Sequence, residues 1–283
     1  MIRPLTIFKA LLIGFAAAAC SPADDNQQAA DTTSVDERRP PAQAPGDGAS
    51  GISSAIAAAV ANPARSEQAR VRDAGRKPTE ILTFFGVKPG MTVLDVGAGS
   101  GYYTEILDAA VGPGGKVLAQ NTPGDFYDNF LKTSFEPLAE RLANVEPYLI
   151  SMTDIDLEDA TLDAAFIFLI YHHMHYNPDE GEALPGRTKA ILARIRAALK
   201  PGGILGIIEH AAPDGASRAD SAPLHRVDPA TTKLDITGQG FDLAAESDLL
   251  HFRTDDRSVY WRNTPYQGKT WRLVHKYVKP VGE

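Results

Sequence analysis

The sequence is poor in cysteine and in basic runs, and each absence excludes a class of protein. Its 283 residues include one cysteine, so no disulfide can form within the chain. The formal net charge is −8, and no long run of lysine or arginine occurs. Because neutralising phosphates supplies much of the affinity for DNA and RNA, this charge argues against a nucleic-acid partner. We therefore expect the partner to be a small-molecule substrate.

The chain also lacks an apolar run long enough for a confident membrane span. The amino terminus has two basic residues, a short apolar run and four alanines directly before Cys20. This layout predicts a secretory signal peptide over residues 1–20. The position of Cys20 resembles the lipobox of bacterial lipoproteins, although Ala17 stands where leucine is usual; a plain signal peptide is the alternative. We therefore expect an exported protein, periplasmic or held at the bacterial cell envelope by a lipid on Cys20.

Large apolar side chains are scarce in the next stretch, residues 21–52, which is rich in Ala, Asp, Pro, Gln and Gly. Such a composition cannot bury enough surface to offset the entropy lost on ordering. The sequence predicts a disordered linker over residues 21–52 and one folded domain over residues 53–283.

Within that domain the apolar pattern alternates between helix and strand. Five strands are predicted at 91–97, 115–121, 145–151, 162–172 and 204–210. Helices are predicted at 78–87, 100–112, 125–143, 186–203 and 228–240, with a break near Pro137 and stops at Pro201 and Gly202. Two final strands, within 241–253 and 270–280, should pair antiparallel. The pattern predicts an α/β fold, a Rossmann-like doubly wound seven-stranded sheet, mostly parallel with an antiparallel C-terminal strand pair.

The first predicted strand ends in a glycine-rich turn, "VLDVGAGSGYYT", with Gly97, Gly99 and Gly101 two residues apart. In doubly wound sheets this turn borders the ligand site, and we expect its backbone N–H groups to be free for a ligand. Tyr102 follows where a P-loop needs lysine, and the spacing differs from the dinucleotide pattern G-x-G-x-x-G. A tight structural turn without a ligand is the alternative.

The turn and its flanks, with Asp95 two residues before Gly97, resemble the first motif of class I S-adenosylmethionine-dependent methyltransferases. The segments "FIFLIYHHMHY", "LKPGGILGIIEH" and "LHRVD" extend the likeness, over roughly residues 66–280, to a subgroup of predicted bacterial methyltransferases with exported members. The resemblance implies S-adenosyl-L-methionine as cofactor, with Gly97, Gly99 and Gly101 facing its methionine and ribose and Asp95 helping to organise the site.

The resemblance also points to further cofactor-binding residues. Where the class usually has an acid that accepts from the ribose hydroxyls, this chain has Gln120 and Asn121, whose amide oxygens are weaker acceptors. Asp154 is the nearest match to the acid near the adenine amine, with Asp156 as the alternative. Two tyrosines complete the set as packing partners of adenine or methionine, unless they belong to the core: Tyr103 and Tyr171.

All seven histidines lie after residue 171, several of them at predicted strand ends. Neighbouring parallel strands bring their carboxyl ends to one rim, where a base can accept a proton from a methylated oxygen or nitrogen. We expect His172 or His173 to be that base and Arg226 to bind a substrate carboxylate or phosphate. Glu209 and His225 complete the predicted catalytic group. Several of these side chains are acceptable metal ligands, but adjacent histidines are no zinc spacing, so the sequence assigns no metal site.

These features favour a methyltransferase acting on a small-molecule or envelope-associated substrate. Two alternatives remain open: an exported ligand-binding protein that kept the fold without the reaction, and a metal-assisted enzyme that uses the histidines.

Overall fold

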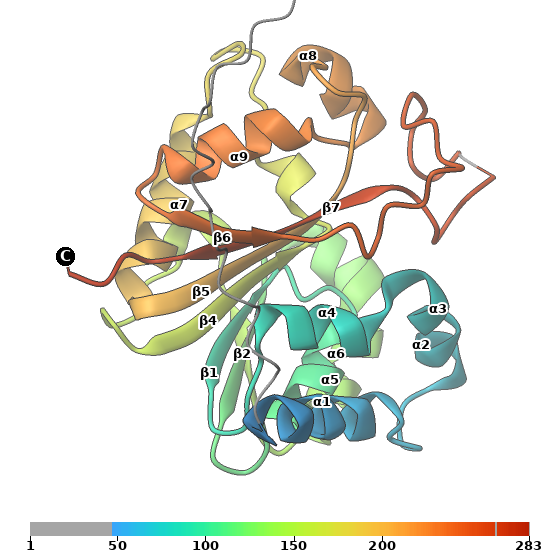
Figure 1. The fold of residues 1–283 in the computed structure, drawn as a ribbon, viewed down its shortest axis with the longest axis vertical. Coiled ribbons are helices and arrows are strands. Elements are labelled where there is room, and N and C mark those ends of the chain that lie inside the picture. The colour runs from blue at the N-terminus through green and yellow to red at the C-terminus, as the bar shows by residue number, and fades with distance from the viewer. Residues whose placement is uncertain (1–46, 264, 283) are drawn as a thin grey trace, which may run out of the picture. The chain divides into compact units, whose positions relative to one another are not determined.

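The computed structural model describes residues 47–263 and 265–282, and the predicted signal peptide with Cys20 lies outside them. Seven strands form one sheet in the order β3-β2-β1-β4-β5-β7-β6 (Figure 1). The strands are β1 (Thr92–Val96), β2 (Lys116–Asn121), β3 (Val145–Leu149), β4 (Leu162–Phe168), β5 (Leu199–His210), β6 (Asp242–Glu246) and β7 (Arg272–Val278). The first five are parallel, and β7 runs antiparallel between β5 and β6. The predicted fold class is confirmed.

Helices cover both faces of this sheet. They are α1 (Asp47–Val60), α2 (Glu67–Val71), α3 (Asp73–Arg76), α4 (Pro78–Phe85), α5 (Tyr102–Val111), α6 (Lys132–Glu140), α7 (Gly186–Ala198), α8 (Arg218–Ser221) and α9 (Pro229–Thr237). Figure 1 shows α7 and α9 on one side of the sheet and α1, α4 and α5 on the other. Among the helices of the described residues, none has the length and apolar character needed to cross a membrane.

Several helix ends follow directly from local sequence. Pro78 begins α4, and Gly86 ends it with a φ of 78°, in the left-handed region that favours glycine. Asp228 caps α9 by accepting the backbone N–H of Thr231. These predicted caps are confirmed.

Three boundaries differ from the prediction. The break in the helix at 125–143 is a π-helix, η1 (Tyr127–Leu131), while Pro137 lies inside α6. Helix α7 ends at Ala198, because Leu199 is already extended and pairs with Leu162 of β4, so Pro201 and Gly202 belong to β5. Helix α1 begins at Asp47, so the carboxyl end of the predicted linker is helical.

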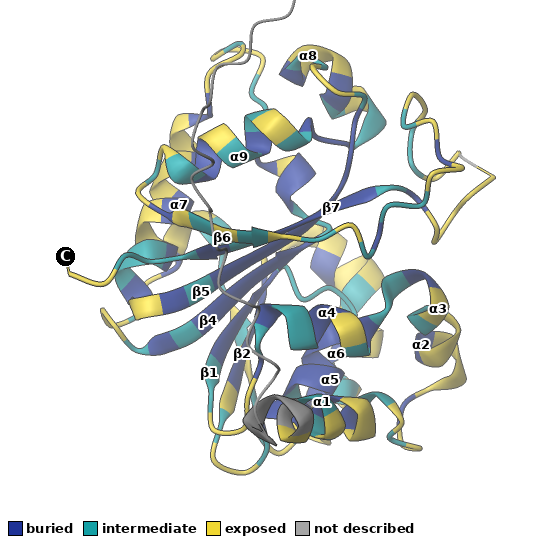
Figure 2. Cartoon of the chain, in the orientation of Figure 1, coloured by how far each residue is buried: buried dark blue, intermediate teal, exposed yellow. Residues whose placement is uncertain are grey.

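The core occupies both faces of the central strands, which are almost entirely buried in Figure 2. One apolar cluster packs α7 against the sheet, and a second packs α1, α4 and α5 against the other face. Parallel strands β1, β4 and β5 therefore end along one edge of the sheet. The glycine turn follows β1, the 3-10 turn η3 (Tyr171–His173) follows β4, and Glu209 and His210 are the last two residues of β5.

Candidate functional site

A cavity of about 710 Å³ lies beside the carboxyl end of β1. Its wall includes five of the residues that the sequence predicts as cofactor-binding, namely Asp95, Gly97, Gly99, Tyr103 and Asn121. Apolar side chains of Phe126, Met152 and Ile170 line another part of it. A cavity of this size, with a mostly apolar surface and a limited set of charged and polar groups, has the character of a small-molecule site.

The three glycines of the turn have φ angles of 64°, 62° and 84°, values that residues with a Cβ rarely adopt. A Cβ on Gly97 would lie 2.9 Å from Cγ1 of Ile170, and one on Gly101 would clash with the side chain of Leu138. Gly101 therefore packs against α6 and does not line the cavity. Gly99 has open space beside it, so it allows the closest approach of a ligand to the backbone.

The backbone N–H groups of Gly97 and Gly99 are not free, contrary to the expectation from the sequence. Gly97 N–H donates to Oε1 of Gln120, and Gly99 N–H donates to Oδ1 of Asn121, each at 2.9 Å. Strands β1 and β2 are adjacent, so amide side chains at the end of β2 reach the turn. The glycines thus provide room for a ligand rather than donors to it.

The two predicted ribose acceptors have different places. Gln120 is fully buried, its Nε2 donates to the carbonyl oxygen of Ile150 at 2.7 Å, and it does not line the cavity. Asn121 lines the cavity, and its Nδ2 donates to the carbonyl oxygen of Gly99 at 3.1 Å. A carbonyl oxygen has two lone pairs, so Oδ1 of Asn121 can still accept a hydroxyl. Of the pair, Asn121 is the residue positioned to contact a ligand.

Asp95 is a buried carboxyl group at the base of the cavity, and 2% of its surface is exposed. Its Oδ2 accepts a hydrogen bond from Oγ1 of Thr104 at 2.7 Å. Burial raises the pKa of Asp95 to about 6, although Thr104 and the positive charge of Arg76 lower it. Asp95 makes no salt bridge with any described residue, so a cationic ligand group would compensate its charge.

Three arginines that the sequence analysis did not select line the cavity as a cationic wall: Arg72, Arg76 and Arg272. Within the described residues none of them lies within salt-bridge distance of a carboxylate. Arg272 is buried and donates to the carbonyl oxygens of Gly75 and Gly268. Burial, and then the charge of Arg76, lowers the pKa of Arg272 to about 10. An anionic ligand group would relieve this uncompensated charge.

The remaining predicted cofactor residues lie outside the cavity wall. Tyr171 is fully buried, and its hydroxyl donates to Oδ2 of Asp235 at 2.9 Å. It therefore belongs to the core, the alternative to packing on the cofactor. Asp154 belongs to the 3-10 turn η2 (Met152–Asp154), but Met152 is the residue of that turn that reaches the cavity. Asp156 lies 3.4 Å from Nη1 of Arg194.

Three of the histidines converge beside the cavity. One ring nitrogen from each of His172, His173 and His225 lies within 4.8 Å of the others. Burial lowers the pKa of His173 to about 4, with His172 and His225 adding to the shift, and burial also lowers that of His225. Both rings are therefore neutral near pH 7 and can accept a proton. None of the three histidines lines the cavity. His210, which stacks on Trp261 and lines the cavity with it, lies between the cavity and the ring of His172.

Glu209 lies behind this group, fully buried at the end of β5. Its Oε2 lies 2.9 Å from Nδ1 of His172 and accepts the backbone N–H of His172, while Oε1 accepts that of His210. Burial alone would raise its pKa, but the charge and hydrogen bonds of His172 outweigh this effect and lower it. Glu209 is thus an ionised group that positions His172, not one that meets a ligand.

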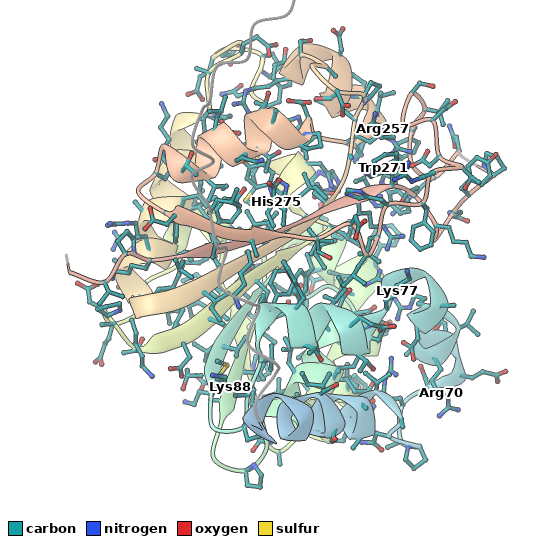
Figure 3. The ribbon with its side chains drawn as sticks, in the orientation of Figure 1. Arg70, Lys77, Lys88, Arg257, Trp271 and His275 are labelled. Carbon is teal, nitrogen blue, oxygen red and sulfur yellow. The ribbon has the colours of Figure 1, made fainter. Side chains whose placement is uncertain are left out.

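The structure places Arg226 differently from the prediction. Its side chain is 0% exposed, and its two terminal nitrogens donate to both oxygens of Asp255 at 2.9 and 3.0 Å. It also donates to the carbonyl oxygens of Ala211 and Val259. With its donors satisfied inside the protein, Arg226 holds the loop between β6 and β7 and does not bind a substrate anion. Figure 3 shows the same loop, where Arg257 lies over the ring of Trp271.

Comparison with known proteins agrees with this geometry. The order of the seven strands and the helices on both faces of the sheet match a Rossmann-like methyltransferase fold. Residues 94–207 match the family model described as a methyltransferase domain. No curated protein sequence matches this chain.

Solved structures share the fold at low sequence identity. A SAM-dependent methyltransferase from Aquifex aeolicus is 21% identical, with a TM-score of 0.51 over 73% of this chain and 97% of that one. One from Mesorhizobium loti is 13% identical, with a TM-score of 0.50 over 74% and 100%. The cyclase SpnF is 17% identical, with a TM-score of 0.50 over 82% and 93%. The domain match and this fold support S-adenosylmethionine as the cofactor.

Proposed function

We propose that this protein is an S-adenosylmethionine-dependent methyltransferase that acts on a small-molecule substrate. The observation that carries the proposal is the cavity beside the glycine turn, with a buried carboxyl group at its base and a cationic wall around it. The methyltransferase-domain match over residues 94–207 supports the same conclusion.

The residues present fit each part of the cofactor. The cationic wall suits its carboxylate, and Asp95 suits its ammonium group. Asn121 can accept from a ribose hydroxyl, and Gly99 leaves room for the chain to approach the ligand. Met152, Ile170 and Phe126 offer apolar surface for adenine.

When bound, the cofactor supplies a methyl group activated by a positively charged sulfur. The chain's own contribution is to position the acceptor and remove its proton. His172 or His173 remains the proposed base, and burial keeps the ring of His173 neutral near pH 7, so that it can take a proton from an oxygen or nitrogen. Both histidines adjoin the cavity past His210 and Trp261, so the substrate would bridge the cavity and the histidines.

Isothermal titration of the purified protein with S-adenosylmethionine and S-adenosylhomocysteine tests the proposal. We expect micromolar binding, about −8 kcal/mol, with one site per chain. A folded protein that binds neither compound would overturn it.

A second candidate is a ligand-binding protein without methyl transfer. Gln120 favours it, because a neutral amide tied to Ile150 occupies the place of the acid usual in the class. SpnF, a cyclase with this fold, is an example of a different reaction on the same scaffold. Cofactor binding without formation of S-adenosylhomocysteine across a panel of small hydroxyl and amine compounds would favour this candidate.

We also propose that the chain is exported to the bacterial cell envelope. The support is the amino-terminal sequence alone: basic residues, an apolar run and a lipobox-like end at Cys20.

A further inference from the structure

The histidines that converge beside the cavity differ from the other buried histidines in their bonding. His175 contacts the carbonyl oxygen of His172 at 2.9 Å and Oγ of Ser221 at 3.2 Å, and His210 contacts Oγ1 of Thr270 at 2.7 Å. By contrast, the rings of His173 and His225 make no hydrogen bond with any residue that the structure describes. Their ring nitrogens are therefore available to a ligand.

Two separate segments bring these rings together. His172 and His173 lie in the turn after β4, and His225 ends the 3-10 turn η4 (Ala222–Leu224) in a left-handed conformation with φ 51°. The ring centroids of His172 and His173 are 4.2 Å apart, and each is 5.1 Å from that of His225. The strained backbone of His225 turns its side chain into this group at an energetic cost, which a function would explain.

The carboxylate of Glu209 adds a second feature of metal sites. Its Oε2 lies 2.9 Å from the buried Nδ1 of His172, near enough for an ion pair but outside hydrogen-bond geometry, and accepts the backbone N–H of the same residue. Histidine ligands commonly give their second ring N–H to a carboxylate, which fixes the ring and leaves the other nitrogen free for the ion. Glu209 is placed for that role.

We propose that His172, His173 and His225 bind a divalent transition-metal ion, with Glu209 as the positioning residue behind His172. Imidazole nitrogens favour ions such as Zn²⁺, Co²⁺ and Ni²⁺ over Mg²⁺ or Ca²⁺. Zinc–nitrogen distances are about 2.0–2.1 Å, so binding draws the three nitrogens closer together. His173 reaches the molecular surface, although neighbouring groups desolvate its ring, and His225 is half-buried, so both can make this movement.

Three protein ligands leave at least one position on the ion for water or a substrate oxygen. His210 connects this position to the cavity, because its ring lines the cavity and lies 6.4 Å from that of His172. The site would thus select ligands that carry a metal-binding oxygen. Metal binding does not depend on binding of S-adenosylmethionine, because none of the three histidines lines the cavity, but an ion on His172 and His173 would occupy the imidazoles proposed above as the base.

Titration of the metal-stripped protein, expressed without a polyhistidine tag, with Co²⁺ tests the site through visible absorption bands and calorimetry. We expect one ion per chain, displaced by Zn²⁺. His173→Ala and His225→Ala should weaken binding by about 100-fold or more, and Glu209→Gln by about 10- to 100-fold. His251→Ala is the matched control, because His251 packs on Trp271 away from this group, and it should bind as the unaltered protein does.

Absence of saturable Co²⁺ binding by folded protein would overturn the proposal, as would unchanged binding in both His173→Ala and His225→Ala. Titration of the same samples with S-adenosylmethionine keeps the two proposals separate. None of the three histidines lines the cavity, so cofactor binding should persist when metal binding is lost.

Discussion

Gly99 is the residue at which a small change should have the largest effect on the ligand. A side chain there enters open space in the cavity wall, and its φ of 62° disfavours any residue with a Cβ. We expect Gly99→Val to abolish measurable binding of S-adenosylmethionine while the domain remains folded. Calorimetric titration and thermal unfolding measure the two effects.

Gly181 supplies the control, because it has the same φ of 62°, has no atom within 4 Å of an added Cβ and lies away from the cavity. Gly181→Val carries the same backbone strain and should bind normally. If Gly99→Val binds as tightly as Gly181→Val, the glycine turn does not contact the ligand.

Asp95 should make stability depend on pH. Burial raises its pKa to about 6 from a usual 3.8, so the folded state holds the proton more tightly than the unfolded chain does. Asp95 therefore lowers the free energy of unfolding progressively as pH rises from about 4 to about 6. Above about pH 6 this destabilisation is complete and stays constant. Relative to the unaltered protein, Asp95→Asn should gain up to about 3 kcal/mol over this window.

Urea unfolding of both proteins at pH 4 and pH 7.5 measures this difference. The contributions of all other titratable groups to the pH dependence are the same in the two proteins and cancel when they are compared. Asparagine retains an oxygen for Thr104, so the substitution leaves that hydrogen bond possible. If the stability of the two proteins depends on pH in the same way, folding does not raise the pKa of Asp95.

At the scale of elements, the side-chain amides of Gln120 and Asn121 at the end of β2 hold the glycine turn by accepting its N–H groups. Gln120 does not take over the ribose-binding role of the acid that is usual at this place in the class. Gln120→Glu restores the acid but places a second acceptor against the carbonyl oxygen of Ile150, in a fully buried position. We expect it to lower the free energy of unfolding by at least about 2 kcal/mol without tightening cofactor binding. Chemical denaturation and calorimetry provide both values.

Asn121→Asp is the comparison variant, because that side chain borders the cavity and its charge can reach a ligand. Its cofactor affinity should respond to the substitution, whereas that of Gln120→Glu should not. Tighter binding by Gln120→Glu would show that Gln120 turns toward the cavity.

The elements themselves were largely predictable, because apolar periodicity and caps are local properties. Pro78, Gly86 and Asp228 mark helix ends in the sequence as they do in the structure. The end of α7 was not predictable in this way, since Leu199 leaves the helix to pair with Leu162, which lies on another strand. Long-range pairing decided that boundary.

The site was predictable where the chain is continuous and not where the fold brings distant segments together. Gly97 and Gly99 come from one motif, and both line the cavity. The sequence predicts Arg226 to be free for a substrate anion, because its partner Asp255 lies 29 residues later in a loop that shows no recognisable motif. Arg76 and Arg272 of the cationic wall are far apart in the sequence and close together only in the folded protein. No local sequence pattern predicts that they line the same cavity.

At the scale of the whole molecule, export is tested by a change outside the described residues. If Cys20 carries a lipid, Cys20→Ser should move the protein from the membrane fraction to the soluble periplasmic fraction and abolish labelling by radioactive palmitate. Ser21→Ala, at the next position, is the control and should leave both unchanged. Unchanged partitioning of Cys20→Ser would favour a plain signal peptide or another anchor.

The cavity is also built from the two ends of the described chain. Arg272 at the start of β7 donates to the carbonyl oxygen of Gly75. Lys77, which is labelled in Figure 3, donates to the carbonyl oxygen of Leu249 in the loop after β6. During translation Arg72, Arg76 and the glycine turn are therefore made long before Arg272, the third residue of the cationic wall. A nascent chain that still lacks β7 has no Arg272 to complete the wall, so we expect the complete ligand site to form only after β7 has been made.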